Sequence, residues 1–262
     1  TVRRRSAHRN GGRLKHPDPQ VLTIALLSMD RFATAIVAGD VHGEVAPLEA
    51  LLALARERRQ PLVLLGDYVN RGPQSRLVLE VLANAPEYED GRFVFLRGNH
   101  ERELLKFLDG GPLEEFAAHG GLATIKSYLM DDITDDPARA FRERFDVRHR
   151  KLLESLPSFL ETHDYLFSHT GFDPFDVTLR TDAAVAGRGN SRIFAHSGPW
   201  PRRRTFFGHF VQATDVPFIS QHLVCLDTGC GTVRGRPLTA FDIASGQILQ
   251  FESSTDVGDG FD

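Results

Sequence analysis

Short apolar runs alternate with amphipathic stretches along most of the chain. The amphipathic stretches at 47–59 and 74–85 carry apolar side chains at helical spacing, and Pro47 stands where the first turn of a helix tolerates proline. The apolar runs around these two helices have the length and composition of buried strands: FATAIVAGD at 32–40, PLVLLGD at 61–67 and RFVFLRGNHE at 92–101. This alternation of strand and helix predicts an α/β fold.

Three further strands are predicted in the second half of the chain, at 164–171, 204–210 and 222–230. The interval between the two groups of strands, about 104–162, is mostly helical in pattern and is broken by GGP and DDITDDP. We expect this interval to form a helical cap that shapes the access of a substrate.

Both ends of the chain lack apolar periodicity. Residues 1–30 combine arginines with glycine and proline and are expected to form a flexible arm. Residues 253–262 are polar and contain glycine, which is typical of a disordered tail. One folded domain is therefore expected at 31–252.

Composition and charge narrow the class of protein. The 262 residues are 41% hydrophobic and 25% charged, as in an ordinary globular chain. A net charge of -4 and a pI near 6.2 provide no basic field, so neither nucleic acid nor an anionic membrane is an expected partner. No apolar run approaches the length of about 18 residues that a membrane span needs. With only Cys225 and Cys230 present, a reducing compartment, and hence the cytoplasm, is expected.

Polar side chains follow the ends of the predicted strands. In open α/β sheets, ligands bind in the crevice beyond the carboxyl ends of the strands. Carboxylate, amide and imidazole groups without a thiolate suit Mn(II), Fe or Zn, and a pair of such ions about 3.5–4 Å apart activates water for an in-line displacement at phosphorus. Any one of these side chains could instead be a turn cap or a hydrogen-bonded core residue. The complete set favours two ions: one on Asp40 and His42, the other on Asn99, His169 and His209, with Asp67 bridging both.

Six motifs then occur in an order that resembles a known family. GDVHG, GDYVNRG, LRGNHE, SHTG, GHF and LDTG are similar to the signature of the PPP-type metallophosphatases of the calcineurin-like phosphoesterase superfamily. The resemblance covers roughly residues 33–243. It implies a β-sandwich flanked by helices, makes 31–252 a metallophosphatase domain, and assigns the same six residues to a binuclear metal centre. Manganese is the expected metal, with iron or zinc as alternatives.

The resemblance also implies roles in catalysis. It makes His100 the general acid that protonates the leaving oxygen, and Arg71 a clamp on the phosphoryl oxygens. A planar guanidinium suits this task because it can donate two hydrogen bonds to one phosphate. Asn99 would lie beside the same phosphate, and the second arginine of the clamp would be Arg188 or Arg192.

One residue departs from the family pattern. Where the family has GDxxDRG, this chain has Asn70 in GDYVNRG. The resemblance implies that residue 70 orients His100 and keeps it charged. An asparagine supplies no negative charge, so we expect a less stable imidazolium and a weaker general acid.

The resemblance leaves several functions open. The preferred prediction is a bacterial serine/threonine protein phosphatase that attacks phosphomonoesters with a metal-bridging water, impaired to some degree by Asn70. The alternatives are a symmetrical dinucleoside tetraphosphate hydrolase and a pseudoenzyme that binds metal and phosphate without turnover. The substrate would be a phosphorylated protein or a nucleotide. A two-metal nuclease is disfavoured. Such nucleases of the broader superfamily commonly carry a GHxH motif, and here Val211 stands where the second histidine of that motif would be.

Overall fold

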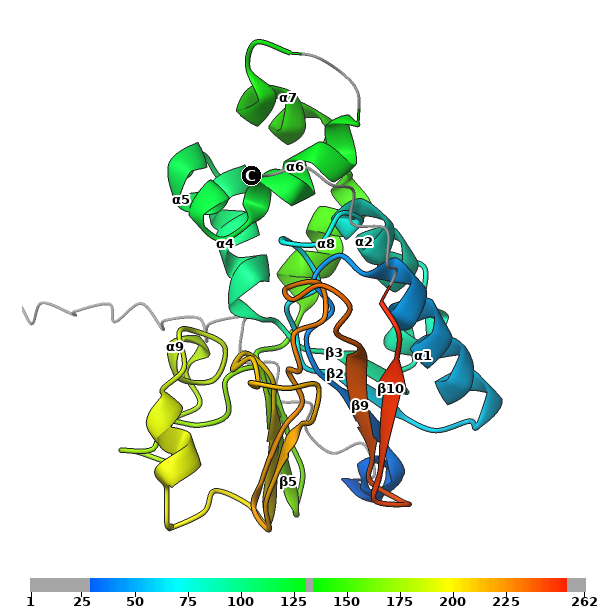
Figure 1. Ribbon diagram of the computed structural model, residues 1–262, viewed down its shortest axis with the longest axis vertical. Helices are drawn as coiled ribbons and strands as arrows, with labels where there is room; N and C mark the ends of the chain where they lie inside the picture. The colour runs from blue at the N-terminus through cyan, green and yellow to red at the C-terminus, as the bar shows by residue number, and fades with distance from the viewer. Residues whose placement is uncertain (1–28, 131–133, 254–262) are drawn as a thin grey trace, which may run out of the picture.

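Two five-stranded β-sheets pack face to face in the molecule (Figure 1). The structure is a computed structural model that describes residues 29–130 and 134–253. The first sheet has the strand order β10-β9-β1-β2-β3, and the second has the order β4-β5-β6-β8-β7. The strands are β1 (Ile36–Ala38), β2 (Leu62–Leu64), β3 (Phe93–Phe95), β4 (Phe159–Glu161), β5 (Tyr165–Ser168), β6 (Arg204–Phe207), β7 (Phe218–Ile219), β8 (Leu223–Cys225), β9 (Leu238–Asp242) and β10 (Gln247–Phe251).

Three neighbouring strands of each sheet run parallel. In the first sheet β1, β2 and β3 are parallel neighbours, and Val37 is level with Val63 and Val94. In the second sheet β5, β6 and β8 are parallel neighbours. Within each sheet, the carboxyl ends of these strands therefore meet at one edge. An antiparallel hairpin of β9 and β10 closes the first sheet.

The core has one layer between the sheets and another under the helices. Successive side chains of a strand point to opposite faces, so Val37 packs between the sheets with Phe167 and Phe206. Its neighbours Ile36 and Ala38 point the other way, into the core beneath the helices. Burial on both faces explains why the first strands are continuously apolar in sequence.

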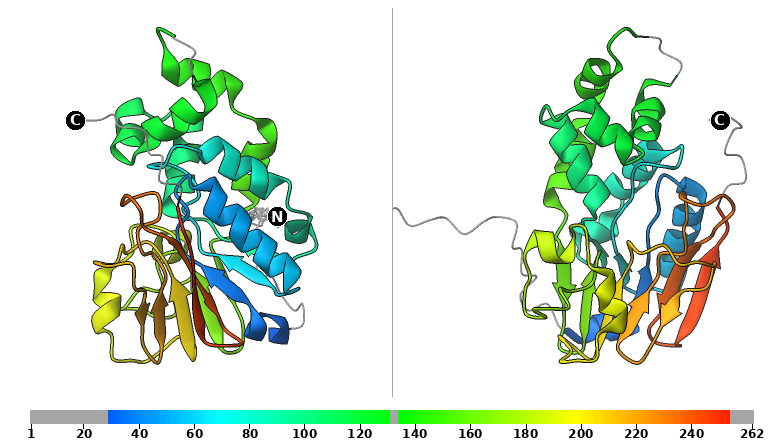
Figure 2. Two further views of the ribbon diagram at one scale, coloured as in Figure 1. Left: turned by 45° about the vertical axis from the view of Figure 1, so that its right-hand side comes forward. Right: turned by 60° about the vertical axis from the view of Figure 1, so that its left-hand side comes forward.

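Helices cover the outer face of the first sheet and extend beyond its edge (Figure 2). Helices α1 and α2 pack on the sheet, while α4 to α8 rise above it in the region for which a cap is expected. The α-helices are α1 (Val45–Glu57), α2 (Ser75–Ala83), α3 (Pro86–Glu89), α4 (Asn99–Leu108), α5 (Leu113–Ala118), α6 (Gly121–Leu129), α7 (Pro137–Arg144), α8 (Val147–Ser155) and α9 (Asp182–Val185).

The α/β expectation is confirmed, and the differences from the predicted elements are local. The strand expected at 32–40 is restricted to β1, because Met29–Thr34 forms a 3-10 helix in which the Ala35 amide donates to the Phe32 carbonyl. The end of the expected cap interval belongs to β4, an edge strand of the second sheet. Most of the predicted arm and tail, at 1–28 and 254–262, lies outside the described residues. Among the described helices, none has both the length and the apolarity to cross a membrane.

Candidate metal centre

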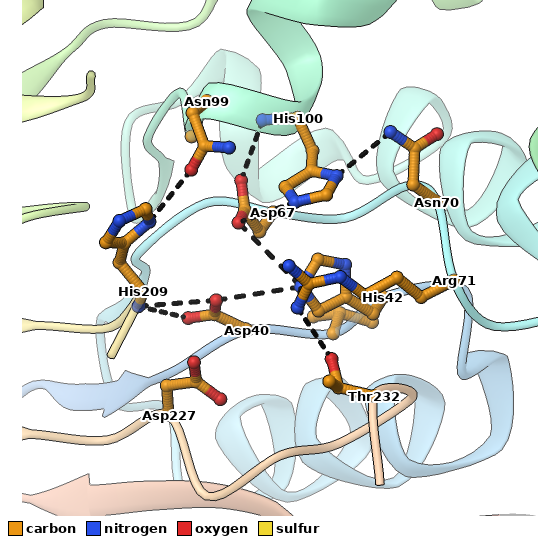
Figure 3. A network of polar contacts seen from close by, with 12 residues as sticks. Asp40, His42, Asp67, Asn70, Arg71, Asn99, His100, His209, Asp227 and Thr232 are labelled. Carbon is orange, nitrogen blue, oxygen red and sulfur yellow. Dashed lines mark hydrogen bonds and ion pairs between the residues drawn. The ribbon is translucent and has the colours of Figure 1, made fainter. Parts of the chain in front are cut away.

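The polar residues that follow the parallel strands converge on one site, as Figure 3 shows. They come from both sheets, since three follow β1 to β3 and three follow β5, β6 and β8. All lie within three residues of their strand ends, except Asn99, which is the first residue of α4. The six residues at these junctions are Asp40, Asp67, Asn99, His169, His209 and Asp227.

Tight turns hold these side chains in place. Seven described residues other than glycine have a positive φ, and five of them are site residues: His42, Asp67, Asn70, Arg71 and His209. A left-handed backbone is unfavourable for residues with a side chain, and such strain is maintained only where the surrounding structure imposes it. The packed sheets therefore hold the site in a geometry that an isolated loop would not keep.

Two glycines let the main chain approach the carboxylates. A Cβ on Gly98 would lie 2.1 Å from Asp67 Oδ1 and 2.5 Å from the Asp67 amide nitrogen. A Cβ on Gly208 would lie 2.0 Å from Asp40 Oδ1. No side chain fits in either place, so the close approach depends on glycine.

Three histidines each donate one ring N–H to a main-chain carbonyl. A carbonyl can only accept a hydrogen bond, so the nitrogen facing it carries a proton, and in the neutral ring the other nitrogen has a lone pair. This arrangement is typical of metal-binding histidines, in which the ring nitrogen that does not bind the metal donates its N–H to a neighbouring group. The contacts are His42 Nδ1 to Val69 O at 2.9 Å, His169 Nδ1 to Leu65 O at 3.1 Å, and His209 Nε2 to Arg188 O at 2.8 Å.

The free nitrogens of these histidines point at buried carboxylates and at one another. His42 Nε2 lies 3.8 Å from an oxygen of Asp40 and 3.8 Å from Asp67 Oδ2, and His169 Nε2 lies 3.1 Å from Asp67 Oδ2. His209 Nδ1 is 3.2 Å from His169 Nε2, and Asn99 Oδ1 lies about equally close to both. Two facing nitrogen lone pairs need a cation between them, either a proton or a metal ion. The donor set therefore fits divalent metal.

Asp67 occupies the centre of the cluster. Potential ligand atoms of His42, Asp67 and His100 lie within 4.8 Å of one another, and so do those of Asp67, His169 and His209. Asp67 is the member common to both groups. A carboxylate shared between two groups of potential ligand atoms fits a bridge between two ions.

The charges of the cluster are unbalanced when it holds only protons. Burial alone would raise the pKa of Asp67, but His169 and His100 lower this pKa well below its ordinary value. Burial likewise lowers the pKa of His169, yet the neighbouring Asp67 raises it to about 9. The pKa of Asp40 is raised well above its ordinary value, first by burial and then by the charge of Asp227. A divalent cation would supply the missing positive charge.

His100 lies over the cluster at the start of α4. Its amide donates to Asp67 Oδ1 at 3.0 Å, and its Nδ1 is 2.9 Å from Asn70 Nδ2. The Thr124 hydroxyl lies 2.7 Å from Asn70 Oδ1, so the amide group of Asn70 turns its nitrogen toward the imidazole. Nδ1 then accepts a hydrogen bond and the proton of the neutral ring is on Nε2. Burial lowers the pKa of His100 to about 4, with Asp67 opposing the shift.

The three candidate arginines lie in different places. Arg71 Nη1 donates to His42 Nε2 at 3.0 Å and to Thr232 Oγ1 at 2.8 Å, so it is at the cluster. Arg188 contributes its main-chain carbonyl, while its side chain is exposed. The guanidinium of Arg192 lies 5.4 Å from the ring centroid of the exposed Phe175.

Two buried carboxylates of the site were assigned no role from the sequence. Glu101 accepts hydrogen bonds from the amides of Asp67 at 2.8 Å, Tyr68 at 2.8 Å and Gly98 at 2.9 Å, and so it ties the loop after β2 to the start of α4. Burial, followed by the charge of Asp67, raises the pKa of Glu101 to about 7. The second carboxylate is Asp227. Both residues lie within the motifs LRGNHE and LDTG, which could have indicated them.

A separate cluster of Glu80, Asp146 and His149 lies between α2 and α8. Here Arg148 donates to Glu80 at 2.9 Å and to Asp146 at 2.8 Å. The guanidinium already neutralises these carboxylates, so this cluster is accounted for as an ion-pair network.

The fold and the donor set define a metal-dependent phosphoesterase of the α/β sandwich class. The chain belongs to the calcineurin-like phosphoesterase family, whose model matches residues 33–212. The family resemblance and the expected phosphoester hydrolase activity are thereby confirmed, and membership implies divalent metal ions.

Relatives and solved structures add detail. The chain is 26% identical over 243 residues to the asymmetrical bis(5'-nucleosyl)-tetraphosphatase PrpE of Bacillus subtilis, covering 83% of this chain and 94% of that protein. It is 34% identical over 140 residues to a symmetrical bis(5'-nucleosyl)-tetraphosphatase of Thioalkalivibrio sulfidiphilus, covering 52% of this chain and 44% of the relative. A cold-active protein-tyrosine phosphatase of a Shewanella species has the same fold, with a TM-score of 0.51 at 15% identity over 83% of this chain and 80% of that one.

Proposed function

We propose that this protein is a two-metal hydrolase of dinucleoside tetraphosphates. The orientation of the three histidines carries the metal part of the proposal. Nε2 of His42 and of His169 faces buried carboxylates, and Nδ1 of His209 faces Nε2 of His169. One ion would be held by Asp40 and His42, and the other by Asn99, His169 and His209, with Asp67 between them. When bound, such ions activate a water for in-line attack and neutralise the phosphoryl oxygens.

The residues of the chain would then divide the remaining tasks. Arg71 now donates to the free nitrogen of His42. With a substrate present, its guanidinium can turn to the phosphoryl oxygens and donate two hydrogen bonds to them. Arg188 or Arg192 would supply the second clamp. Glu101 holds the backbone of Asp67 in position through its hydrogen bonds.

The contact between Asn70 and His100 supports a nucleotide substrate. In this contact Asn70 donates to Nδ1 and supplies no negative charge, so it does not stabilise an imidazolium. A serine alkoxide is a poor leaving group that needs a proton from the general acid. A nucleotide phosphate leaves more readily, since its second pKa is about 6 and it is stable as an anion. The site is therefore better suited to phosphoanhydrides than to phosphoserine.

The relatives support the same choice. Across 243 residues, which is most of its length, the chain resembles a protein named as an asymmetrical dinucleoside tetraphosphatase. The predicted serine/threonine phosphatase activity is the competing outcome of one assay. Hydrolysis of diadenosine tetraphosphate, a phosphoserine peptide and p-nitrophenyl phosphate would be compared with Mn²⁺ and with chelator.

We expect Mn²⁺-dependent turnover with the highest kcat/KM for diadenosine tetraphosphate, and AMP plus ATP as products. Two molecules of ADP would instead group the protein with the symmetrical enzymes. A phosphoserine peptide as the best substrate would refute the nucleotide assignment. Bound Mn²⁺ without hydrolysis of any of the three compounds would favour the pseudoenzyme.

A further inference from the structure

Asp227 has a buried oxygen without a partner. The residue is 1% exposed, and its Oδ1 accepts the amide of Gly229 at 3.0 Å. Within the part of the chain that the structure describes, Oδ2 has no hydrogen-bond partner. A buried carboxylate oxygen is costly unless a hydrogen bond or a cation compensates it.

The two sheets bring this oxygen to the metal centre. Gly39 precedes Asp40 at the end of β1, and a Cβ on Gly39 would lie 2.5 Å from Leu226 O and 3.1 Å from the Asp227 amide nitrogen. The ends of β1 and β8 therefore touch. Figure 3 shows the carboxylate of Asp227 near that of Asp40, and the charge of Asp227 acts on Asp40.

We infer that Asp227 is a further carboxylate of the metal centre and helps to hold the ion bound by Asp40 and His42. This inference rests on the proposed two-metal function. Two buried carboxylates side by side repel each other, and a divalent cation between them removes that repulsion. Mutation of a group that supports the residues bound directly to a metal ion commonly lowers metal affinity by about 10–100-fold.

The turn after Asp227 uses only one oxygen of its carboxylate. Among the described residues, this side chain accepts one hydrogen bond, from the Gly229 amide, and the oxygen of an asparagine can accept it too. Asp227→Asn therefore removes the charge and retains the turn. Asp242→Asn is a matched control, because Asp242 is also buried but lies at the opposite end of β1, where Arg58 and Gln60 bind it.

The test is Mn²⁺ titration by calorimetry, together with thermal unfolding in chelator and in Mn²⁺. The parent chain should bind two ions. Asp227→Asn should weaken one of them by about 10–100-fold and give a smaller Mn²⁺-induced rise in Tm, while its Tm in chelator should not fall. Asp242→Asn should leave Mn²⁺ binding unchanged. If Asp227→Asn does not fold, Asp227→Ser removes the same charge and can still accept the Gly229 amide.

The outcomes separate this inference from the proposed function. Two ions bound with unchanged affinities in Asp227→Asn would overturn the inference and leave the two-metal function standing. A lower Tm in chelator with unchanged Mn²⁺ binding would show that Asp227 has only a structural role. If the parent chain binds no Mn²⁺, the two-metal function itself fails.

Discussion

Replacing Asn70 by aspartate should strengthen the general acid and change which substrates the enzyme hydrolyses best. In the parent chain, Asn70 Nδ2 lies 2.9 Å from His100 Nδ1 and donates to it. The variant places a carboxylate at the same position, which can accept only if His100 carries a proton on Nδ1. The Thr124 hydroxyl, 2.7 Å from Asn70 Oδ1, can still donate to the second carboxylate oxygen.

The size of the effect follows from this one contact. A hydrogen bond to a charged group contributes roughly 1.5–3 kcal/mol. At 1.36 kcal/mol for each pKa unit, this raises the pKa of His100 by about 1–2 units from its value of about 4. At neutral pH, the protonated fraction of His100 would then rise by about 10–100-fold. Only reactions that depend on this proton gain from the change.

The assay is kcat/KM between pH 5 and 9 with saturating Mn²⁺ for three substrates. We expect Asn70→Asp to raise kcat/KM for a phosphoserine peptide by about tenfold or more, and to move the alkaline limb of its pH profile upward. For p-nitrophenyl phosphate and diadenosine tetraphosphate the gain should stay below about threefold, because their leaving groups need less protonation.

Asn84→Asp is a control for this variant, since Asn84 is exposed at the end of α2 and its side chain donates to the main-chain and side-chain oxygens of Glu80. It should leave all three rates unchanged. An equal gain for the three substrates in Asn70→Asp, or no gain for the phosphoserine peptide, would refute the account of His100 as a weakened acid.

Three further predictions concern the framework of the site. Gly98→Ala places a Cβ 2.1 Å from Asp67 Oδ1 and should lower Mn²⁺ affinity in calorimetry; unchanged affinity would contradict the need for glycine there. Glu101→Gln turns an amide group toward main-chain donors and should lower the free energy of unfolding by about 1–3 kcal/mol, measured as a lower Tm. A Tm equal to that of the parent would show that these hydrogen bonds contribute nothing to stability. Without metal, Asp67 raises the pKa of His169 to about 9. The protonated His169 therefore stabilises the folded protein fully below about pH 6.5, and this stabilisation is lost as the pH rises to 9. The Tm should fall over that window, and it should fall less in Mn²⁺ because a ligand nitrogen carries no proton; a flat profile in chelator would contradict the pairing of His169 with Asp67.

Much of the site could be predicted from sequence because it is built from strand ends. Asp40 and Asp67 follow buried apolar runs, and parallel strands bring such ends to one edge. The edge strands β4 and β7 were not predicted, since β7 spans only Phe218–Ile219 and a run of this length has no readable period. The sequence also left undecided which arginine is the second phosphate clamp. Arg188 and Arg192 both lie in a loop whose path depends on its neighbours.

The sequence by itself determined the α/β class, the order of the motifs and the kinds of ligand that the site contains, because local apolar patterns and residue types carry this information. Only the tertiary structure decided which nitrogen of each histidine is free, since the carbonyl partners of His42 and His169 are distant in the chain. It also decided that the segment containing Asp227 lies against Gly39, next to Asp40, because these segments meet only where two separate sheets pack together. Contacts between distant segments depend on packing and have no local pattern.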